Sequence, residues 1–137
     1  MPAYPVLMHT ALDAADCRGL AEFYRQFLGL RYRPGDEVPD DAGDDADWLV
    51  LLDAAGHRVL AFKEVPALAR PTWPAHDVPT QMHHDFRVPG IEELQRQRQR
   101  AEELGAILLY DRTDDDEPLY VLADPAGHPF CILVSSE

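Results

Sequence analysis

Asp53-Ala-Ala-Gly-His57 and Asp124-Pro-Ala-Gly-His128 are two copies of one turn sequence, one in each half of the chain, and each is followed by an apolar run. Met8-His9 likewise returns as Met82-His83 in the second half. A Leu-Gly pair that ends a helical pattern also recurs. These features follow the same order at nearly constant spacing, which indicates a duplicated module. We therefore expect two copies of one fold that share a ligand-binding groove.

Each half contains the same order of secondary-structure patterns. The first half begins with a strand over 5–12, which is followed by a helix with Asp16 as its N-cap and Gly29 as its C-cap. Three short apolar or alternating runs then predict strands, over 30–33, 48–53 and 58–64. The second half repeats this order, in a strand over 81–88, a helix over 91–104 and strands over 106–110, 118–123 and 129–134.

These patterns predict an α+β fold that is built from two βαβββ modules. Module one covers 1–65 and module two covers 80–137. The segment 66–79 contains four prolines, which are incompatible with a helix or a central strand, so we expect it to be a linker. Residues 1–137 together have the size of one ordinary domain.

The composition narrows the class of protein. A formal net charge of −13 argues against binding to nucleic acid or to anionic membranes, because both require a basic surface. The chain has neither a run of membrane-helix length nor the pattern of a signal peptide, which predicts a cytoplasmic location. Cys17 and Cys131 occupy non-equivalent places in the two halves and are expected to be reduced. Asp53 and Asp124 are expected to hydrogen-bond the turn backbone.

Several motifs together carry a resemblance to a known family. They are Phe23-Tyr-Arg-Gln-Phe-Leu-Gly29, the turn Asp124-Pro-Ala-Gly127, the segment from Trp73-Pro74 to Met82-His-His-Asp85, and the closing Pro129-Phe-Cys131. The chain thereby resembles a glyoxalase-like branch of the vicinal oxygen chelate superfamily, which includes glyoxalase I, bleomycin-resistance proteins, fosfomycin-resistance enzymes and extradiol dioxygenases. The resemblance implies that the sheets curl into a half-open barrel with the helices outside, and that the protein is a homodimer.

The resemblance also implies positions for a divalent metal. Catalytic members of the superfamily commonly hold it with two His and one Glu from the first and last strands of the modules. The matching positions here are His9, Leu60, His83 and Cys131. The carboxylate is missing, but His, His and Cys form a zinc-compatible set with one open position. Cys131 is equally consistent with core packing, because its neighbours in the strand are apolar.

The strand over 81–88 has one polar face. Because side chains alternate along a strand, Gln81, His83, Asp85 and Arg87 share one face, while Met82, His84, Phe86 and Val88 share the other. If Met82, Phe86 and Val88 pack under the helices, the polar face lies on the concave side of the sheet, where a ligand would bind. We expect His84 to be a hydrogen-bonded core residue. The candidate ligand-binding residues, including aromatic side chains of both modules, are His9, Trp48, Phe62, Trp73, Gln81, His83, Asp85, Tyr110 and Tyr120.

Acidic residues are concentrated in two equivalent loops. The loops at 36–47 and 111–117 hold 12 of the 25 acidic residues of the chain. We expect the side chains of Asp40, Asp41, Asp44 and Asp45 to be exposed and to repel one another. The loops either keep the protein soluble or steer a cationic ligand toward the groove.

Three functions remain open from the sequence. The first is a module that binds a small cationic or aromatic molecule and catalyses nothing. The second is a metal-dependent lyase, isomerase or dioxygenase in which His9 and His83 hold the metal as a Lewis acid. The third is a metal-free reaction in which His83 or Asp85 acts as a general base.

Overall fold

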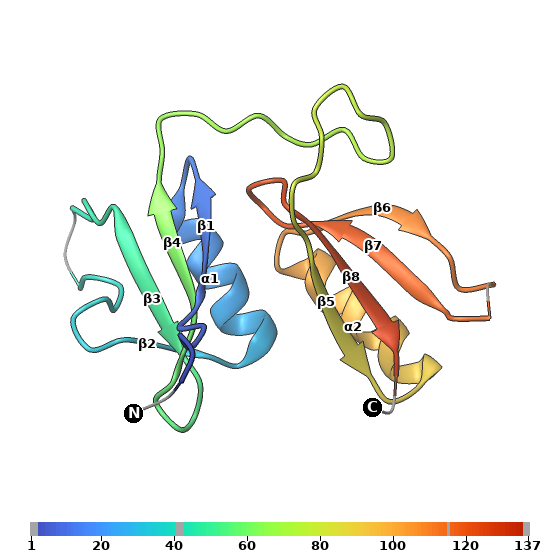
Figure 1. Ribbon diagram of the computed structural model, residues 1–137, viewed down its shortest axis with the longest axis horizontal. Helices are drawn as coiled ribbons and strands as arrows, with labels where there is room; N and C mark the ends of the chain where they lie inside the picture. The colour runs from blue at the N-terminus through green and yellow to red at the C-terminus, as the bar shows by residue number, and fades with distance from the viewer. Residues whose placement is uncertain (1–2, 41–42, 115, 136–137) are drawn as a thin grey trace. The chain divides into compact units, whose positions relative to one another are not determined.

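The computed structural model describes residues 3–40, 43–114 and 116–135. It divides into two compact units, 1–67 and 68–137. Each unit contains one helix and a four-stranded sheet in the order β-α-β-β-β (Figure 1). The predicted α+β fold of two βαβββ modules is therefore confirmed. Two residues of the acidic loops, Asp41 and Asp115, lie outside the described residues.

The first unit has the strand order β1-β4-β3-β2, in which β1 runs parallel to β4 and the other neighbours are antiparallel. Its elements are β1 (Thr10–Ala14), α1 (Cys17–Leu28), β2 (Arg31–Tyr32), β3 (Trp48–Leu52) and β4 (Arg58–Glu64).

The second unit repeats this topology with the strand order β5-β8-β7-β6, and again only the first pair is parallel. Its elements are β5 (His84–Val88), α2 (Ile91–Glu103), β6 (Ile107–Asp111), β7 (Leu119–Ala123) and β8 (Pro129–Val134).

The first strand of each module begins later than predicted. Pairing starts at Thr10, opposite Leu60, and at His84, opposite Phe130, so the residues before them have no strand to pair with. The chain turns just before β4 and β8, which explains why no partner extends further in that direction. Met82 consequently lies ahead of β5 and is 72% exposed, so it does not pack under a helix as Phe86 and Val88 of the same alternating set could.

The predicted caps of α1 are confirmed. The Asp16 carboxylate accepts a hydrogen bond from the Gly19 amide at 3.0 Å, and Gly29 adopts a left-handed conformation with φ = 67°. The predicted turns are also confirmed. Asp53 accepts hydrogen bonds from the amides of Ala55 and His57, and Asp124 does the same in the second turn. Both cysteines are free.

One face of each sheet packs against its helix. In the first unit, Tyr24 of α1 stacks on Phe62 of β4, with ring centroids 6.0 Å apart. Leu60 lies on the same face of β4 as Phe62, because side chains alternate along a strand. In the second unit Phe86 and Phe130 pack edge to face on the corresponding side. The opposite side of each sheet is called its helix-free face below.

A β-bulge makes β4 differ from its counterpart β8. Leu52 pairs with Arg58 but Leu51 pairs with Leu60, so Val59 is an extra residue in β4. β8 shows no such shift opposite β7. Beyond the bulge, the residue equivalent to Cys131 is therefore Ala61 and not Leu60. The assignment of Leu60 as the matching ligand position is corrected accordingly, since Leu60 faces α1.

The acidic loop of the first unit is anchored rather than freely solvated. The Arg18 guanidinium binds the Asp44 carboxylate at 2.6 Å, donates to the Asp36 carbonyl oxygen at 2.7 Å and lies 5.0 Å from the centre of the Tyr32 ring. Asp36 also binds Arg33. Asp44 is exposed as predicted. The expectation that its carboxylate repels its acidic neighbours is wrong, because Arg18 neutralises it.

Candidate functional site on the second sheet

The helix-free face of the second sheet carries a continuous row of side chains. Residues directly opposite one another in paired strands point to the same side of a sheet. The pairs Asp85–Cys131, Cys131–Val121 and Val121–Tyr110 therefore place these residues in one row across β5, β8, β7 and β6 (Figure 1). The row begins with a carboxylate and a thiol and ends with an aromatic ring.

A polar cluster lies at the β5 end of this row. It consists of His83, Asp85 and Cys131, whose potential ligand atoms all lie within 4.8 Å of one another. His83 Nε2 is 3.4 Å from Asp85 Oδ1, and both side chains are about half exposed. The neighbouring strand pairing explains the cluster, because β5 and β8 run parallel with Asp85 opposite Cys131.

The Cys131 thiol is protonated at neutral pH in this arrangement. Burial, together with the charge of the Asp85 carboxylate and a hydrogen bond to it, raises the pKa of Cys131 to about 11. A negative neighbour opposes a second negative charge. Only a bound cation that compensates both charges would favour the thiolate.

The polar cluster has a donor set that suits zinc. It offers one nitrogen, one oxygen and one sulfur, and three protein ligands with one open position are typical of catalytic zinc. Ligands of a tetrahedral zinc ion lie about 3.3–3.8 Å apart, given bond lengths of about 2.0–2.3 Å. The three side chains would need to close by about 1 Å, which rotations of half-exposed side chains allow.

The sequence indicated two members of this cluster as metal ligands but missed the third. Asp85 was expected to contact a ligand, and the carboxylate was judged missing from the metal set. The structure places Asp85 directly opposite Cys131. The register of two parallel strands could have revealed this neighbour. His9, the other expected ligand, belongs to the first unit, so its part in a metal site stays a prediction.

An aromatic pair lies at the β6 end of the row. Trp73 packs edge to face against Tyr110, with ring centroids 5.7 Å apart. The two rings line an open pocket of about 560 Å³. Its other lining residues are Pro74, Asp111, Arg112 and Asp114. Two predicted ligand-binding residues are thus brought together beside two carboxylates.

In the first module the corresponding row is apolar. It contains Ala11, Ala61 and Val50, where the second module has Asp85, Cys131 and Val121. Trp48 lies on the same helix-free face and its ring is 5.8 Å from that of His9. Within the described part of the chain, His9 Nδ1 is buried without a hydrogen-bond partner. His9 and His83 each directly precede the first strand of their module.

The sequence matches one family of known domains over most of its length. The model of the family described as a glyoxalase-like domain matches residues 9–133. The chain belongs to this glyoxalase-like family. The family is part of the vicinal oxygen chelate superfamily, so the resemblance found in the sequence is confirmed. Comparison with curated proteins gives no significant match.

Solved structures confirm the fold of this glyoxalase-like domain. A possible glyoxalase from Bacillus cereus is 17% identical, with 93% of this chain and 97% of that chain covered and a TM-score of 0.61. A glyoxalase/dioxygenase from Nostoc punctiforme is 21% identical, with 99% and 100% covered and a TM-score of 0.63. The fosfomycin resistance protein FosX from Mesorhizobium loti is 14% identical, with 97% and 94% covered and a TM-score of 0.66.

Two aromatic residues predicted for the ligand site of the glyoxalase-like domain belong to its helix-facing core. Phe62 is fully buried against Tyr24, and Tyr120 is 4% exposed beneath the Arg98 guanidinium of α2. Both were assigned to the site because they are aromatic, but strand alternation turns them toward the helices. Gln81 is exposed ahead of β5. His84 lies on the helix side, where burial lowers its pKa.

No helix in the described ranges is long and apolar enough to span a membrane.

Proposed function

We propose that this glyoxalase-like protein binds a small aromatic or cationic molecule in the groove predicted from its duplication, and that this binding does not require a metal. The row on the helix-free face of the second sheet is the observation that carries the proposal. Tyr110 and Cys131 are separated by one intervening strand, which corresponds to about 10 Å. A small organic molecule is long enough to touch the aromatic pair and the polar cluster together.

The groups along this face suit such a ligand. An aromatic ring can pack against Trp73 and Tyr110, and a cation can lie over either ring. Asp111 and Asp114 in the same pocket supply the opposite charge. The net charge of −13 further favours cations over anions in the solution around the protein.

The proposal predicts that Trp73→Ala weakens binding of 1-naphthylmethylammonium about 5-fold or more, because the ring loses one wall of its pocket. Calorimetric titration measures the dissociation constants. Tyr4→Ala is the matched control, because Tyr4 is an aromatic residue that is 81% exposed and outside the pocket. Neutral 1-naphthalenemethanol should bind more weakly than the cation. Absence of binding at millimolar concentration, or equal loss in both variants, would contradict the proposal.

If the acidic loops steer cations, the association rate of this probe should fall as salt rises from about 50 to 500 mM, since the screening length shrinks from roughly 14 to 4 Å. Dissociation should change little. Replacing Asp40, Asp45 and Asp47 with Asn should mimic high salt without lowering the melting temperature, because these residues are not buried. Asp44 is left intact because it binds Arg18. If the association rates measured by stopped flow do not depend on the salt concentration, the loops only keep the protein soluble.

A metal-dependent lyase, isomerase or dioxygenase is the second candidate, and the polar cluster is the observation that favours it. His83, Asp85 and Cys131 would hold the metal in the second unit, with His9 as a further ligand. A bound divalent metal would polarise vicinal oxygens of a substrate as a Lewis acid. Elemental analysis of untagged protein purified without chelator separates this candidate from the first one.

A metal-free reaction is the third candidate. His83 lies 3.4 Å from Asp85, so the carboxylate can orient the imidazole as a general base. Its signature would be a reaction that persists in the presence of chelator and is abolished in His83→Gln.

We further propose that the protein is a cytoplasmic homodimer. Each sheet has open edges, and open edges in such small modules can pair with a second copy. Light scattering at micromolar concentration should give about twice the chain mass of 15.4 kDa. A monomer mass would contradict the dimer.

A further inference from the structure

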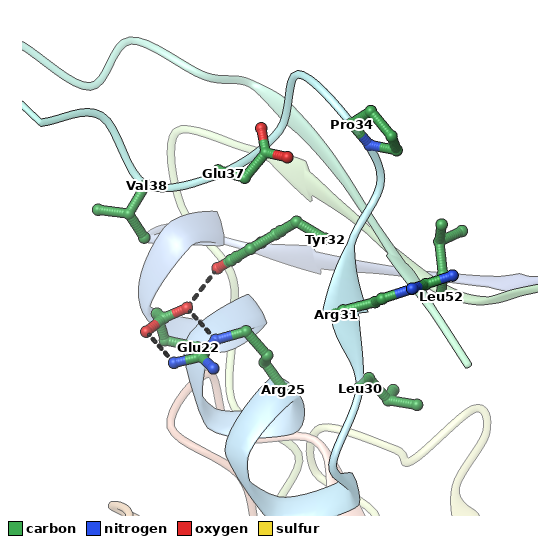
Figure 2. A pocket seen from close by; sticks show the side chains of 9 residues that line it. All are labelled: Glu22, Arg25, Leu30, Arg31, Tyr32, Pro34, Glu37, Val38 and Leu52. Atoms are coloured by element: carbon green, nitrogen blue, oxygen red, sulfur yellow. Dashed lines mark hydrogen bonds and ion pairs between the residues drawn. The ribbon is translucent and has the colours of Figure 1, made fainter. Parts of the chain in front are cut away.

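A second pocket lies along the outer edge of β2 in the first unit. Its volume is about 610 Å³. It is lined by residues from α1, the turn that follows α1, β2, the loop after β2 and β3 (Figure 2): Glu22, Arg25, Leu30, Arg31, Tyr32, Pro34, Glu37, Val38 and Leu52. Because all of these residues belong to the first unit, the pocket is separate from the row on the second sheet.

The pocket combines apolar walls with the guanidinium of Arg31. Leu30, Pro34 and Val38 supply apolar surface, and Val38 is 50% exposed although it is apolar. Arg31 is exposed and has no hydrogen-bond or ion-pair partner among the residues that the structure describes. Figure 2 shows Arg31 extending toward Leu52, while Tyr32 extends from the same strand toward Glu22.

Two of the other charged side chains that line the pocket, Glu22 and Arg25, neutralise each other. The Glu22 carboxylate accepts two hydrogen bonds from Arg25, at 2.7 and 2.9 Å, and one from the Tyr32 hydroxyl at 2.7 Å. Arg25 and Tyr32 together lower the pKa of Glu22, which is therefore charged and fully paired at neutral pH. Glu37 accepts a hydrogen bond from the Gly35 amide at 2.8 Å.

The walls of the pocket are held in place by this network. Tyr32 is fixed from one side by Glu22 and covered on its ring by the Arg18 guanidinium. Arg18 also binds the carbonyl oxygens of Asp36 and Glu37, which precede Val38. The loop that forms the apolar wall is thus tied to α1, and a ligand would find the pocket largely formed.

We propose that this pocket binds a small amphipathic carboxylate, whose acid group pairs with Arg31 and whose apolar body lies along Leu30, Pro34 and Val38. A guanidinium binds a carboxylate through two parallel hydrogen bonds, and Arg31 has its donors free for this. The apolar walls select a hydrocarbon body over a purely polar anion such as acetate. This site would act independently of the aromatic and polar groups on the second sheet.

The test uses octanoate as the probe. Octylammonium has the same apolar chain with the opposite charge, and acetate has the same charged group with a much shorter chain. Backbone amide shifts measured by NMR during titration report both the affinity and the place of binding. Octanoate should shift the amides of Arg31, Tyr32 and Leu52 and bind at least 10-fold more tightly than acetate. Octylammonium should leave these three amides unshifted.

Arg31→Gln should weaken octanoate binding about 10-fold or more without lowering the melting temperature, because the described residues include no hydrogen-bond or ion-pair partner of Arg31. Arg87→Gln is the matched control, since Arg87 is an exposed arginine of the second unit and does not line the pocket. Val38→Asp should also weaken binding, by placing a negative charge on the apolar wall. Equal affinity of the wild type and Arg31→Gln, or shifts confined to the second unit, would overturn the proposal.

Discussion

His83→Ala is expected to lower the affinity for Zn²⁺ at least about 100-fold if the polar cluster holds a metal, because the change removes one of three protein ligands. The imidazole is the only nitrogen donor of the cluster. Without it, the remaining carboxylate and thiol cannot complete a catalytic zinc site with three protein ligands. Competition with a chromophoric chelator measures the affinity.

His84→Ala is the matched control for this experiment. It is the neighbouring histidine, and it lies on the helix side of β5 rather than in the polar cluster. Its zinc affinity should equal that of the wild type. If His83→Ala binds zinc as tightly as the wild type, or if the wild type binds no zinc, the polar cluster is not a metal site. The proposal that the protein binds a small molecule without a metal then stands.

Cys131→Ala and His9→Ala define the other ligands. A loss of zinc affinity of 10-fold or more in Cys131→Ala supports thiolate ligation, whereas a loss of about 1–2 kcal/mol of stability alone marks the thiol as packing. Asp85→Asn tests whether the Asp85 carboxylate, which the pairing of β5 with β8 places opposite Cys131, is a third zinc ligand. His9→Ala tests whether the first module contributes a ligand to the same ion.

Gly127→Ala should destabilise the protein by about 2–4 kcal/mol, because two costs add. Gly127 has φ = 100°, where residues with a side chain are strained. A Cβ atom there would also lie 2.6 Å from Cγ of Arg70, whose guanidinium donates a hydrogen bond to the Pro125 carbonyl oxygen at 2.8 Å. Arg70 would have to leave the turn and lose that bond. Urea unfolding measures the difference.

The duplication supplies the control for this prediction. Gly56 occupies the equivalent turn position with φ = 89°, but the nearest atom to a new Cβ is Arg31 Nη2 at an ordinary 3.7 Å. Gly56→Ala should therefore carry only the backbone cost, about 1–2 kcal/mol. In an Arg70→Ala background, where both the contact and the hydrogen bond are already absent, Gly127→Ala should likewise cost only about 1–2 kcal/mol. Equal destabilisation by both glycine changes would show that the contact with Arg70 contributes nothing.

The sequence predicted the parts of the fold that depend on local chemistry. Asp16 and Gly29 cap α1, and the aspartates of the two turns bond the turn amides, because these interactions span only a short stretch of chain. The starts of β1 and β5 were missed, since a strand begins where its partner is available. That depends on pairing with β4 and β8, which are distant in the sequence.

The candidate site was less predictable for the same reason. Alternation along 81–88 correctly separated Asp85 from Phe86, but it could not show that Asp85 lies opposite Cys131. Aromatic character alone could not distinguish Trp73, which packs on Tyr110 beside a pocket, from Phe62, which packs under α1. Contacts between strands, rather than residue types, determine these differences.

The extra residue in β4 limits how parts can be exchanged between the two halves of this protein. A protein engineer who copied Cys131 into the first half by aligning the two repeated turns would change Leu60 and insert a thiol beneath α1. The position with the correct orientation is the next one along the strand, Ala61, and Ala11 stands beside it where the second half has Asp85. The pair of changes Ala11→Asp and Ala61→Cys therefore copies the two side chains with their orientation preserved. A hybrid of the two halves must contain Val59 if it uses β4, and must lack the extra residue if it uses β8 in that place.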